Sequence, residues 1–144
     1  MEKLITSFFE DDHDKLDALF TRFQSQKQAE PASATELLGR FVHGLLRHIE
    51  WEEQILFPIF ETKVGSAMGP TQVMGFEPGQ IKNLLESIRQ KMDAAADSSE
   101  DERTLLNVLG EHNWKEEHIL YPAIDSQLTS RQVGEVFDRI KASM

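Results

Sequence analysis

One eleven-residue pattern occurs twice in this chain. Residues 48–58 read HIEWEEQILFP, and residues 112–122, displaced by 64 positions, read HNWKEEHILYP. Each copy contains an H-x-x-x-E pair, and on an α-helix two residues four positions apart lie on the same face. The repeat therefore predicts two helices that each present one imidazole and one carboxylate in the same direction.

Apolar residues at helical spacing run through most of the chain, and no segment alternates convincingly in the way of a β-strand. We expect a first helix over about residues 3–28 and a second that begins at an S-x-x-E capping box of Ser33 and Glu36. A third helix should carry Met74 to Met92, and a fourth should begin near Ser98. A short last helix should follow over about residues 129–142. Four amphipathic helices joined by short loops favour an all-α, up-down-up-down four-helix bundle. The short extra C-terminal helix, with a capping box of Thr129 and Gln132, should cover one end or side of it.

Polar residues interrupt three of the apolar stripes at similar depth. The stripes expected to face inward are Ile5, Phe9, Leu16, Phe20 and Phe23 in the first helix, Leu38, Phe41, Leu45, Ile55 and Ile59 in the second, Met74, Ile81, Leu84, Ile88 and Met92 in the third, and Leu105, Leu109, Ile119 and Ala123 in the fourth. The residues that fill the gaps are His13, His48, Glu52, His112 and Glu116. Helical geometry points all five toward the bundle interior.

Buried carboxylates without partners are unfavourable by several kcal/mol each, so this polar set needs an explanation. One explanation is a structural network in which each histidine bonds a glutamate. The other is a metal site, in which cations satisfy every ligand at once. Because the repeat supplies two equivalent half-sites, the metal interpretation predicts two ions bridged by the glutamates. Nitrogen and oxygen ligands in this mixture suit iron, manganese or, less often, zinc.

The composition excludes several classes of function. The chain has 144 residues, which fits one domain over residues 1–144, and it has no cysteine, which excludes disulfides, thiolate zinc sites, iron–sulfur clusters and a cysteine nucleophile. Its formal net charge is −10 and its lysines and arginines form no cluster, so neither nucleic acid nor an anionic membrane is an expected partner. No apolar run is long enough to span a bilayer, and the N-terminus lacks the shape of a signal peptide. We therefore expect a cytoplasmic protein.

These motifs resemble the hemerythrin-like, or HHE cation-binding, domain. The matching features are Asp12-His13-Asp14 in the first helix, H-x-x-x-E-E-x-x-L-F-P in the second, and its counterpart in the fourth, and the resemblance covers about residues 3–127. It implies a four-helix bundle with a non-haem di-iron centre, bridging carboxylates, and reactivity toward dioxygen, nitric oxide or peroxide. The ligand roles that it implies fall on His13, His48, Glu52, His112 and Glu116.

The third helix departs from the family pattern. The family commonly has M-x-x-E-H-x-x-I there, with the histidine as a ligand, whereas this chain has Pro78 in the place of that histidine. Proline cannot bind a metal, and it should kink or restart the helix. Glu77 lies on the inward stripe between Met74 and Ile81. It is either a replacement ligand or an exposed N-cap, and the residues alone leave both open.

Neighbours of the proposed ligands receive weaker expectations. Tyr121 is a candidate hydrogen-bond donor near the site, although aromatic residues are more often packing. Glu117 should point aside, because it lies one residue past Glu116, but a spacing of five residues from the histidine also occurs in the family. His43 and His118 lie off the inward stripes and should be surface residues.

Three functional hypotheses follow. The first is a di-iron protein that binds or senses dioxygen, nitric oxide or peroxide, with an unidentified protein partner if it is a sensor. The second is a carboxylate-rich di-iron enzyme, peroxide-decomposing or ferroxidase-like. The third is a degenerate bundle without metal that acts through protein contacts, for which the motivation is Pro78.

Overall fold

The computed structural model describes residues 4–65 and 78–144, and in these ranges the chain forms helices joined by short turns. The helices are α1 (Leu4–Gln26), α2 (Pro31–Trp51), η1 (Glu52–Leu56), α3 (Phe57–Val64), α5 (Pro78–Asp93), α6 (Ser99–Lys115), η2 (Glu116–Leu120), α7 (Tyr121–Gln127) and α8 (Ser130–Ser143). The elements η1 and η2 are π-helices, and each continues directly from an α-helix into the next one. The second and fourth rods of the bundle are therefore composite, α2–η1–α3 and α6–η2–α7.

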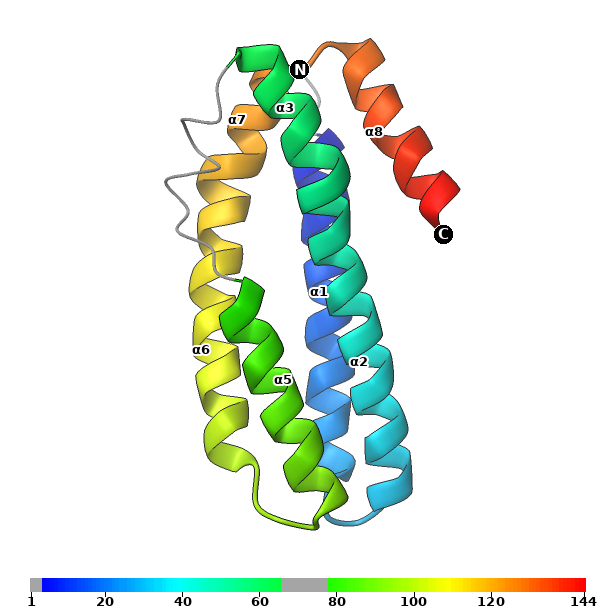
Figure 1. Ribbon diagram of the computed structural model, residues 1–144, viewed down its shortest axis with the longest axis vertical. Coiled ribbons are helices and arrows are strands. Elements are labelled where there is room, and N and C mark those ends of the chain that lie inside the picture. Colours follow the sequence, from blue (N-terminus) through cyan, green and yellow to red (C-terminus); the bar gives the residue numbers. More distant parts are fainter. Residues whose placement is uncertain (1–3, 66–77) are drawn as a thin grey trace.

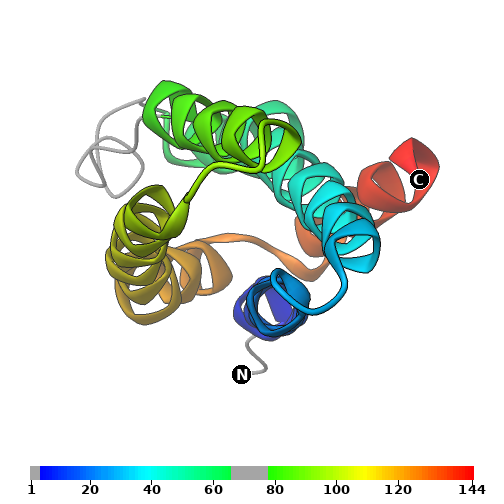
Figure 2. The same ribbon diagram turned by 90° about the horizontal axis from the view of Figure 1, so that it is seen from below.

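The rods form an up-down-up-down bundle, which confirms the predicted fold class (Figure 1). Helix α1 packs against α2, α2 against α5, α5 against α6, and η2 and α7 close the ring against α1. Seen along the bundle axis, the two composite rods stand diagonally opposite each other (Figure 2). Helix α8 lies beside the bundle and packs against η1. None of the described helices is long and apolar enough to cross a membrane.

Two apolar clusters fill the bundle, one at each end. The α8-side cluster is made of Ile5, Phe9, Trp51, Ile55, Leu56, Phe60, Leu120, Tyr121, Ile124, Leu128, Val133, Val136 and Ile140. The α5-side cluster is made of Leu16, Phe20, Phe23, Ala34, Leu37, Leu38, Phe41, Leu45, Ile49, Ile81, Leu85, Ile88, Leu105 and Leu109. Each fully buried side chain of this kind stabilises the fold by about 1.5–3 kcal/mol. Predicted polar residues lie where one cluster gives way to the other. His13 lies between Phe9 and Leu16 in the first rod, and His112 and Glu116 lie between Leu109 and Leu120 in the fourth.

The π-helices begin at the glutamate of each H-x-x-x-E pair. The backbone N–H of Phe57 bonds the carbonyl of Glu52, five residues back, and Tyr121 bonds Glu116 in the same way. The next residue in both copies is a proline, which has no N–H to donate to the carbonyl four residues earlier. The π turn therefore lies where the proline would already leave one α-helical hydrogen bond unformed. Such π turns are rare and often occur at functional sites.

Each π turn moves the inward face of the rod by one residue, and the predicted stripe is wrong beyond this point. In the fourth rod Ile119 is 50% exposed and Ala123 only half-buried, whereas the residue after each of them is buried. The buried residues there are Leu120, Tyr121, Ile124 and Asp125. In the second rod the corresponding residues Leu56 and Phe60 are buried, and the predicted Ile59 is half-buried. Ile55 is buried as predicted, but it lies in the cluster that α8 helps to form. The prediction failed because it assumed 3.6 residues per turn throughout.

The predicted helix starts have mixed outcomes. The capping box of Thr129 and Gln132 is present at the start of α8 and confirms that prediction. The box predicted at Ser33 is wrong, because α2 begins two residues earlier, at Pro31. The Ser33 hydroxyl instead donates to the side chain of Gln26, across the turn from α1. Proline suits the first helical position, since its missing N–H has no acceptor there.

Candidate metal centre

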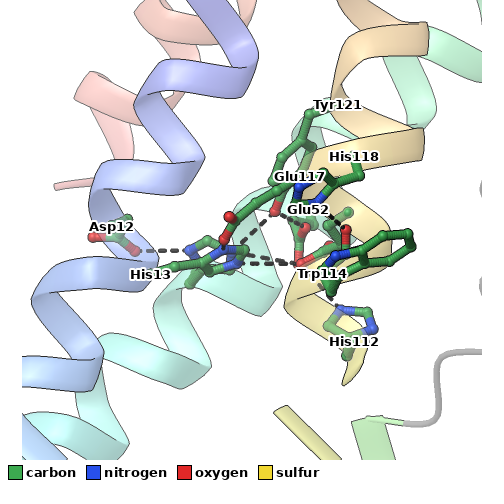
Figure 3. Close-up of polar contacts among 10 residues, drawn as sticks. Asp12, His13, Glu52, His112, Trp114, Glu117, His118 and Tyr121 are labelled. Carbon is green, nitrogen blue, oxygen red and sulfur yellow. Dashed lines mark hydrogen bonds and ion pairs between the residues drawn. The ribbon is translucent and has the colours of Figure 1, made fainter. Parts of the chain in front are cut away.

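The five residues predicted from the stripes come together in the interior of the bundle. Figure 3 shows three of them, His13, Glu52 and His112. Helix α1 contributes His13, the last turn of α2 contributes His48, the first residue of η1 is Glu52, the end of α6 contributes His112, and the first residue of η2 is Glu116. His112 retains 10% side-chain exposure, and the other four are buried. Three rods therefore place three imidazoles and two carboxylates in one nearly dry layer.

Glu116 occupies the middle of this arrangement. Its Oε1 atom lies 3.2 Å from His13 Nε2 and 3.1 Å from His112 Nε2. Two groups of three bring their potential ligand atoms within 4.8 Å of one another, namely His13–His48–Glu116 and Glu52–His112–Glu116. Glu116 belongs to both groups, so the two positions at which a cation would fit share one carboxylate.

Tyr121 donates a hydrogen bond inside the site, as the sequence had indicated. Its hydroxyl donates to Glu52 Oε2 at 2.7 Å and lies 3.3 Å from His48 Nε2. Burial first, and then the charges of Glu52 and Glu116, hold the pKa of Tyr121 well above its usual value. The side chain therefore stays a neutral phenol that can donate.

Two further carboxylates bond the outer nitrogens of the imidazoles. Asp12 Oδ2 lies 2.7 Å from His48 Nδ1, and Glu117 Oε2 lies 2.7 Å from His13 Nδ1. The expectation that Glu117 points aside is wrong, because η2 carries it next to α1. The direction of Asp12 was not foreseen, although it stands in the D-H-D motif beside His13. Its partner lies on another helix, so no local pattern marks the contact.

The two central carboxyls have opposite pKa shifts. Burial, reinforced by the charge of Glu116, raises the pKa of Glu52 well above its usual value. Burial alone would raise the pKa of Glu116 as well, but its contacts with Glu52, His112 and His13 outweigh burial and hold the pKa well below the usual value. In the metal-free protein a proton is therefore held by Glu52 in preference to Glu116, whose charged form is favoured.

The two imidazoles next to Glu116 also differ from each other. Burial alone would lower the pKa of His13, but Glu116 and Glu117 outweigh it and raise the pKa above its usual value. Burial lowers the pKa of His48 by more than Asp12 raises it, and the charge of His13 lowers it further. In the metal-free site the charged form is therefore favoured more at His13 than at His48.

Hydrogen bonding within the protein does not satisfy the site. Among the described residues, His13 Nε2, Glu52 Oε1 and both oxygens of Glu116 are buried without a hydrogen bond of acceptable geometry, although His13 and Glu116 lie at ion-pair distance. A buried polar atom with no partner is unfavourable by about 1–3 kcal/mol, and the ion pairs of Glu116 with His13 and His112 offset part of this cost. A purely structural network would be expected to satisfy these inner atoms as it satisfies the outer nitrogens. Inward-facing nitrogen and oxygen donors of this kind fit a divalent cation.

The remaining predicted residues lie outside the described part of the chain or on its surface. Glu77, predicted as a replacement ligand, lies outside the described residues, and α5 begins at the next residue, Pro78. His43 and His118 are exposed, as predicted, and the ring of His118 stacks on that of Trp114 at a centroid distance of 4.6 Å.

Comparison with known proteins shows which family this chain belongs to. Relatives include a DNA nickase of Nostoc sp., 31% identical over 92% of this chain and 36% of the relative, and the iron-sulfur cluster repair protein YtfE of Escherichia coli O81, 33% identical over 70% of this chain and 51% of the relative. The chain thus spans about half, or less, of the length of these relatives. No solved structure gave a significant match. The family model for the hemerythrin HHE cation binding domain matches residues 4–141, so the chain belongs to this family of metal-binding proteins.

Proposed function

We propose that this protein holds two iron ions in a non-haem di-iron centre and uses them to bind or sense dioxygen, nitric oxide or peroxide. The proposed ligands are His13, His48, Glu52, His112 and Glu116. The observation that carries the proposal is the position of Glu116, which belongs to two groups of potential ligand atoms in a buried layer. A carboxylate in this position is suited to bridge two cations.

The donor set narrows the choice of metal. It contains imidazole nitrogens and carboxylate oxygens and, since the chain has no cysteine, no thiolate. Such a mixture suits iron and manganese and, less often, zinc. Membership in a cation-binding family favours iron through the resemblance described above. The unsatisfied buried atoms favour a loaded site over a degenerate, metal-free bundle.

The protein's own residues would shape the chemistry of the centre. Bound iron supplies the position at which a small ligand binds and the redox change that follows. Tyr121 supplies a neutral hydroxyl next to Glu52 and His48. The ring of Phe9 packs against His48 and Tyr121, with centroid distances of 5.2 and 5.1 Å, and so keeps water from that side. These contacts favour a site that excludes bulk solvent.

The buried carboxylates also support the second candidate, a di-iron enzyme that decomposes peroxide or oxidises ferrous iron. Anionic ligands stabilise ferric iron better than imidazoles do, and here Glu52 and Glu116 enter the inner layer together. The similarity to an iron-sulfur cluster repair protein is compatible with either candidate. It extends to about half of that protein, so cluster repair itself is a separate question for this chain.

Metal analysis followed by spectroscopy tests the proposal. The purified chain is loaded with ferrous iron without oxygen, desalted, and assayed for iron, manganese and zinc. We expect about two ions per chain and optical changes on addition of oxygen or nitric oxide. Sustained turnover of peroxide or ferrous iron would favour the enzyme instead. A protein that retains none of the three metals would overturn the central claim. His118→Ala is the matched control, because this histidine is exposed.

A further inference from the structure

Helices α1 and α2 run side by side, and each supplies one histidine of the His13–His48–Glu116 group (Figure 1). The centroids of the two imidazole rings lie 4.6 Å apart, with an angle of 35° between the ring planes. Because the rings belong to different helices, their separation depends on how closely α1 approaches α2. A residue that sets the spacing of these helices therefore also sets the geometry of this ligand group.

One turn from the histidines, α1 packs against a glycine of α2. A Cβ atom placed on Gly44 would lie 2.8 Å from Leu16 Cδ2. Carbon atoms in contact are ordinarily about 3.5–4.0 Å apart, so a methyl group fits here only if the leucine or its helix moves by about 1 Å. Leu16 is 6% exposed and belongs to the α5-side cluster, where its side chain is surrounded by other apolar groups. It therefore occupies the space that any side chain at Gly44 would need.

This contact and the pair of histidines lie on the same faces of the two helices. Gly44 precedes His48 by four residues in α2. Leu16 follows His13 by three residues in α1. Residues three or four positions apart share one helix face, and the two levels are about one turn, or 5.4 Å, apart. Because protein interiors are close-packed and transmit strain, a movement of α1 at Leu16 would also move His13.

On the other side of the histidine pair, the same interface contains a large side chain. Phe9 precedes His13 by four residues and is fully buried. Its ring packs against that of His48 at a centroid distance of 5.2 Å. A side chain added at Gly44 would push α1 away from α2 at one level, while Phe9 keeps the helices in contact at the other. Helix α1 would then tilt, and His13, which lies between the two levels, would move away from His48.

We propose that Gly44 is a positioning residue for the metal centre. Its missing side chain lets Leu16 pack closely against α2, and this packing holds His13 and His48 at a spacing that allows both to bind the same cation. The inference rests on the proposed function, and it adds a residue that is itself no ligand. One methyl group at Gly44 should therefore weaken metal binding without touching the metal.

The chain offers a matched control on the same helix. Gly39 lies in α2 five residues before Gly44, it is exposed, and a Cβ atom placed on it meets nothing within 4 Å. Alanine is favoured over glycine inside a helix, so both glycine-to-alanine substitutions gain helix propensity. Only Gly44→Ala also creates the contact with Leu16. A difference between the two variants is therefore due to that contact.

Shortening Leu16 should reverse the effect. Leu16→Ala removes the Cδ2 atom that opposes the added methyl group. It also leaves a cavity in the α5-side cluster, which destabilises the fold. In the double variant Gly44→Ala/Leu16→Ala, metal affinity should therefore recover while the melting temperature of the metal-free protein stays low. A purely structural role of Gly44 would not separate the two quantities, because affinity would then follow stability.

The experiment is a titration of the metal-free protein with Co²⁺ under anaerobic conditions, followed by its visible absorption. Co²⁺ suits sites of nitrogen and oxygen donors, and its absorption reports the coordination geometry. Gly44→Ala should alter the spectrum and weaken at least one binding step by about 10- to 100-fold, the usual effect of disturbing groups that orient a metal-bound histidine. Gly39→Ala should change binding by less than about threefold. In the Leu16→Ala background, Gly44→Ala should likewise change binding by less than about threefold.

The possible outcomes separate this inference from the function on which it rests. If the unmodified protein binds no Co²⁺, iron, manganese or zinc, the proposed function fails and the inference falls with it. If the protein binds metal but Gly44→Ala keeps both the affinity and the spectrum, the function stands and the positioning role is refuted. A loss of affinity that persists in full in the Leu16→Ala background also refutes the inference, since the methyl group then does not act through Leu16.

Discussion

The two copies of the repeat have the same backbone and different environments. Each has an H-x-x-x-E pair, a π-helix that begins at the glutamate, and a proline after it. Yet Glu116 is shared by both groups of potential ligands, whereas Glu52 belongs to one and accepts a hydrogen bond from Tyr121. The local sequence thus determines the shape of each segment, while the helix packed against it determines what each side chain contacts.

The neighbours of the two π-helices account for most of this difference. Helix α8 packs against η1, where Ile55 is buried, and α1 packs against η2, whose Glu117 bonds His13. The equivalents in the other copy, Ile119 and Glu53, are exposed. The two copies of the repeat are alike in sequence, but the site that they form is asymmetric. Helix α1 packs on η2 and contributes one histidine, His13, whereas α8 packs on η1.

The largest difference that we expect between the two copies is in metal content. Glu116→Ala should reduce the bound iron from about two ions per chain to nearly none, because both positions lose a ligand. Glu52→Ala should leave about one ion, because this carboxylate belongs only to the Glu52–His112–Glu116 group. The measurement is elemental analysis after anaerobic loading and desalting. Equal losses in the two variants would mean that the carboxylates act symmetrically, as the repeat alone implies.

The next effect concerns packing on the two π-helices. Ile55→Ala should lower the free energy of unfolding by about 2–5 kcal/mol, as expected for a buried isoleucine. Ile119→Ala should change it by no more than about 0.5 kcal/mol, since this side chain is half exposed. Leu120→Ala, at the fully buried position next to it, is the positive control. Urea unfolding of the metal-free proteins measures all three free energies. Equal losses of stability at Ile55 and Ile119 would contradict the change of register and support a continuous α-helix in both rods.

Most of the inner layer could be predicted from the sequence, because its signal is local. A polar residue in the gap of an apolar stripe points inward whatever surrounds the helix, which is why His13, His48, Glu52, His112 and Glu116 meet as expected. Burying such residues without partners is unfavourable, so the same pattern also indicates that the five side chains interact with one another or with a common ligand. Whether all five bind metal stays a prediction.

The outer contacts could not be predicted, because their signal is tertiary. Glu53 and Glu117 have the same local sequence, E-E followed by x-I-L, and only the position of α1 separates a surface glutamate from a partner of His13. The register change beyond the glutamates did have a local signal, a proline at the same place in both copies. A proline in a helix is compatible with a simple bend as well as with a wide turn before it, so this signal alone does not predict the change of register.

A smaller effect should separate Tyr121 from its counterpart in the repeat, Phe57. Tyr121→Phe leaves Glu52 Oε2 without its donor and should destabilise the metal-free protein by about 1–3 kcal/mol. In a Glu52→Ala background the same change should have almost no effect, so a double-mutant cycle gives a coupling of about 0.5–3 kcal/mol. The symmetric cycle, Phe57→Leu with Glu116→Ala, should show coupling near zero. Strong coupling in both cycles would mean that the two aromatic positions are equivalent.

The smallest effect is a difference in pH dependence between the two central glutamates. The pKa of Glu52 is raised in the folded, metal-free protein, so above the usual carboxyl pKa of about 4.5 the folded state binds a proton that the unfolded state releases. Its contribution to stability is therefore present at low pH and declines as the pH rises, by up to about 1.4 kcal/mol per pH unit. Glu116 has the opposite sign, because its pKa is lowered. It contributes stability above about pH 4.5 that is lost as the pH falls.

Substitution by glutamine separates these two contributions. Glu52→Gln resembles the protonated carboxyl, so its advantage over the unmodified protein should grow as the pH rises above about 4.5. Glu116→Gln is made in the Glu52→Gln background, so that only one of the two central carboxyls titrates. It should lose more stability relative to that background at neutral pH than at about pH 3. Urea unfolding in the presence of a chelator, from about pH 3 to pH 8, measures both differences. If the two stability differences changed with pH in the same direction, Glu52 and Glu116 would bind a proton equally well in the metal-free protein. The two halves of the repeat would then differ only once a metal is bound.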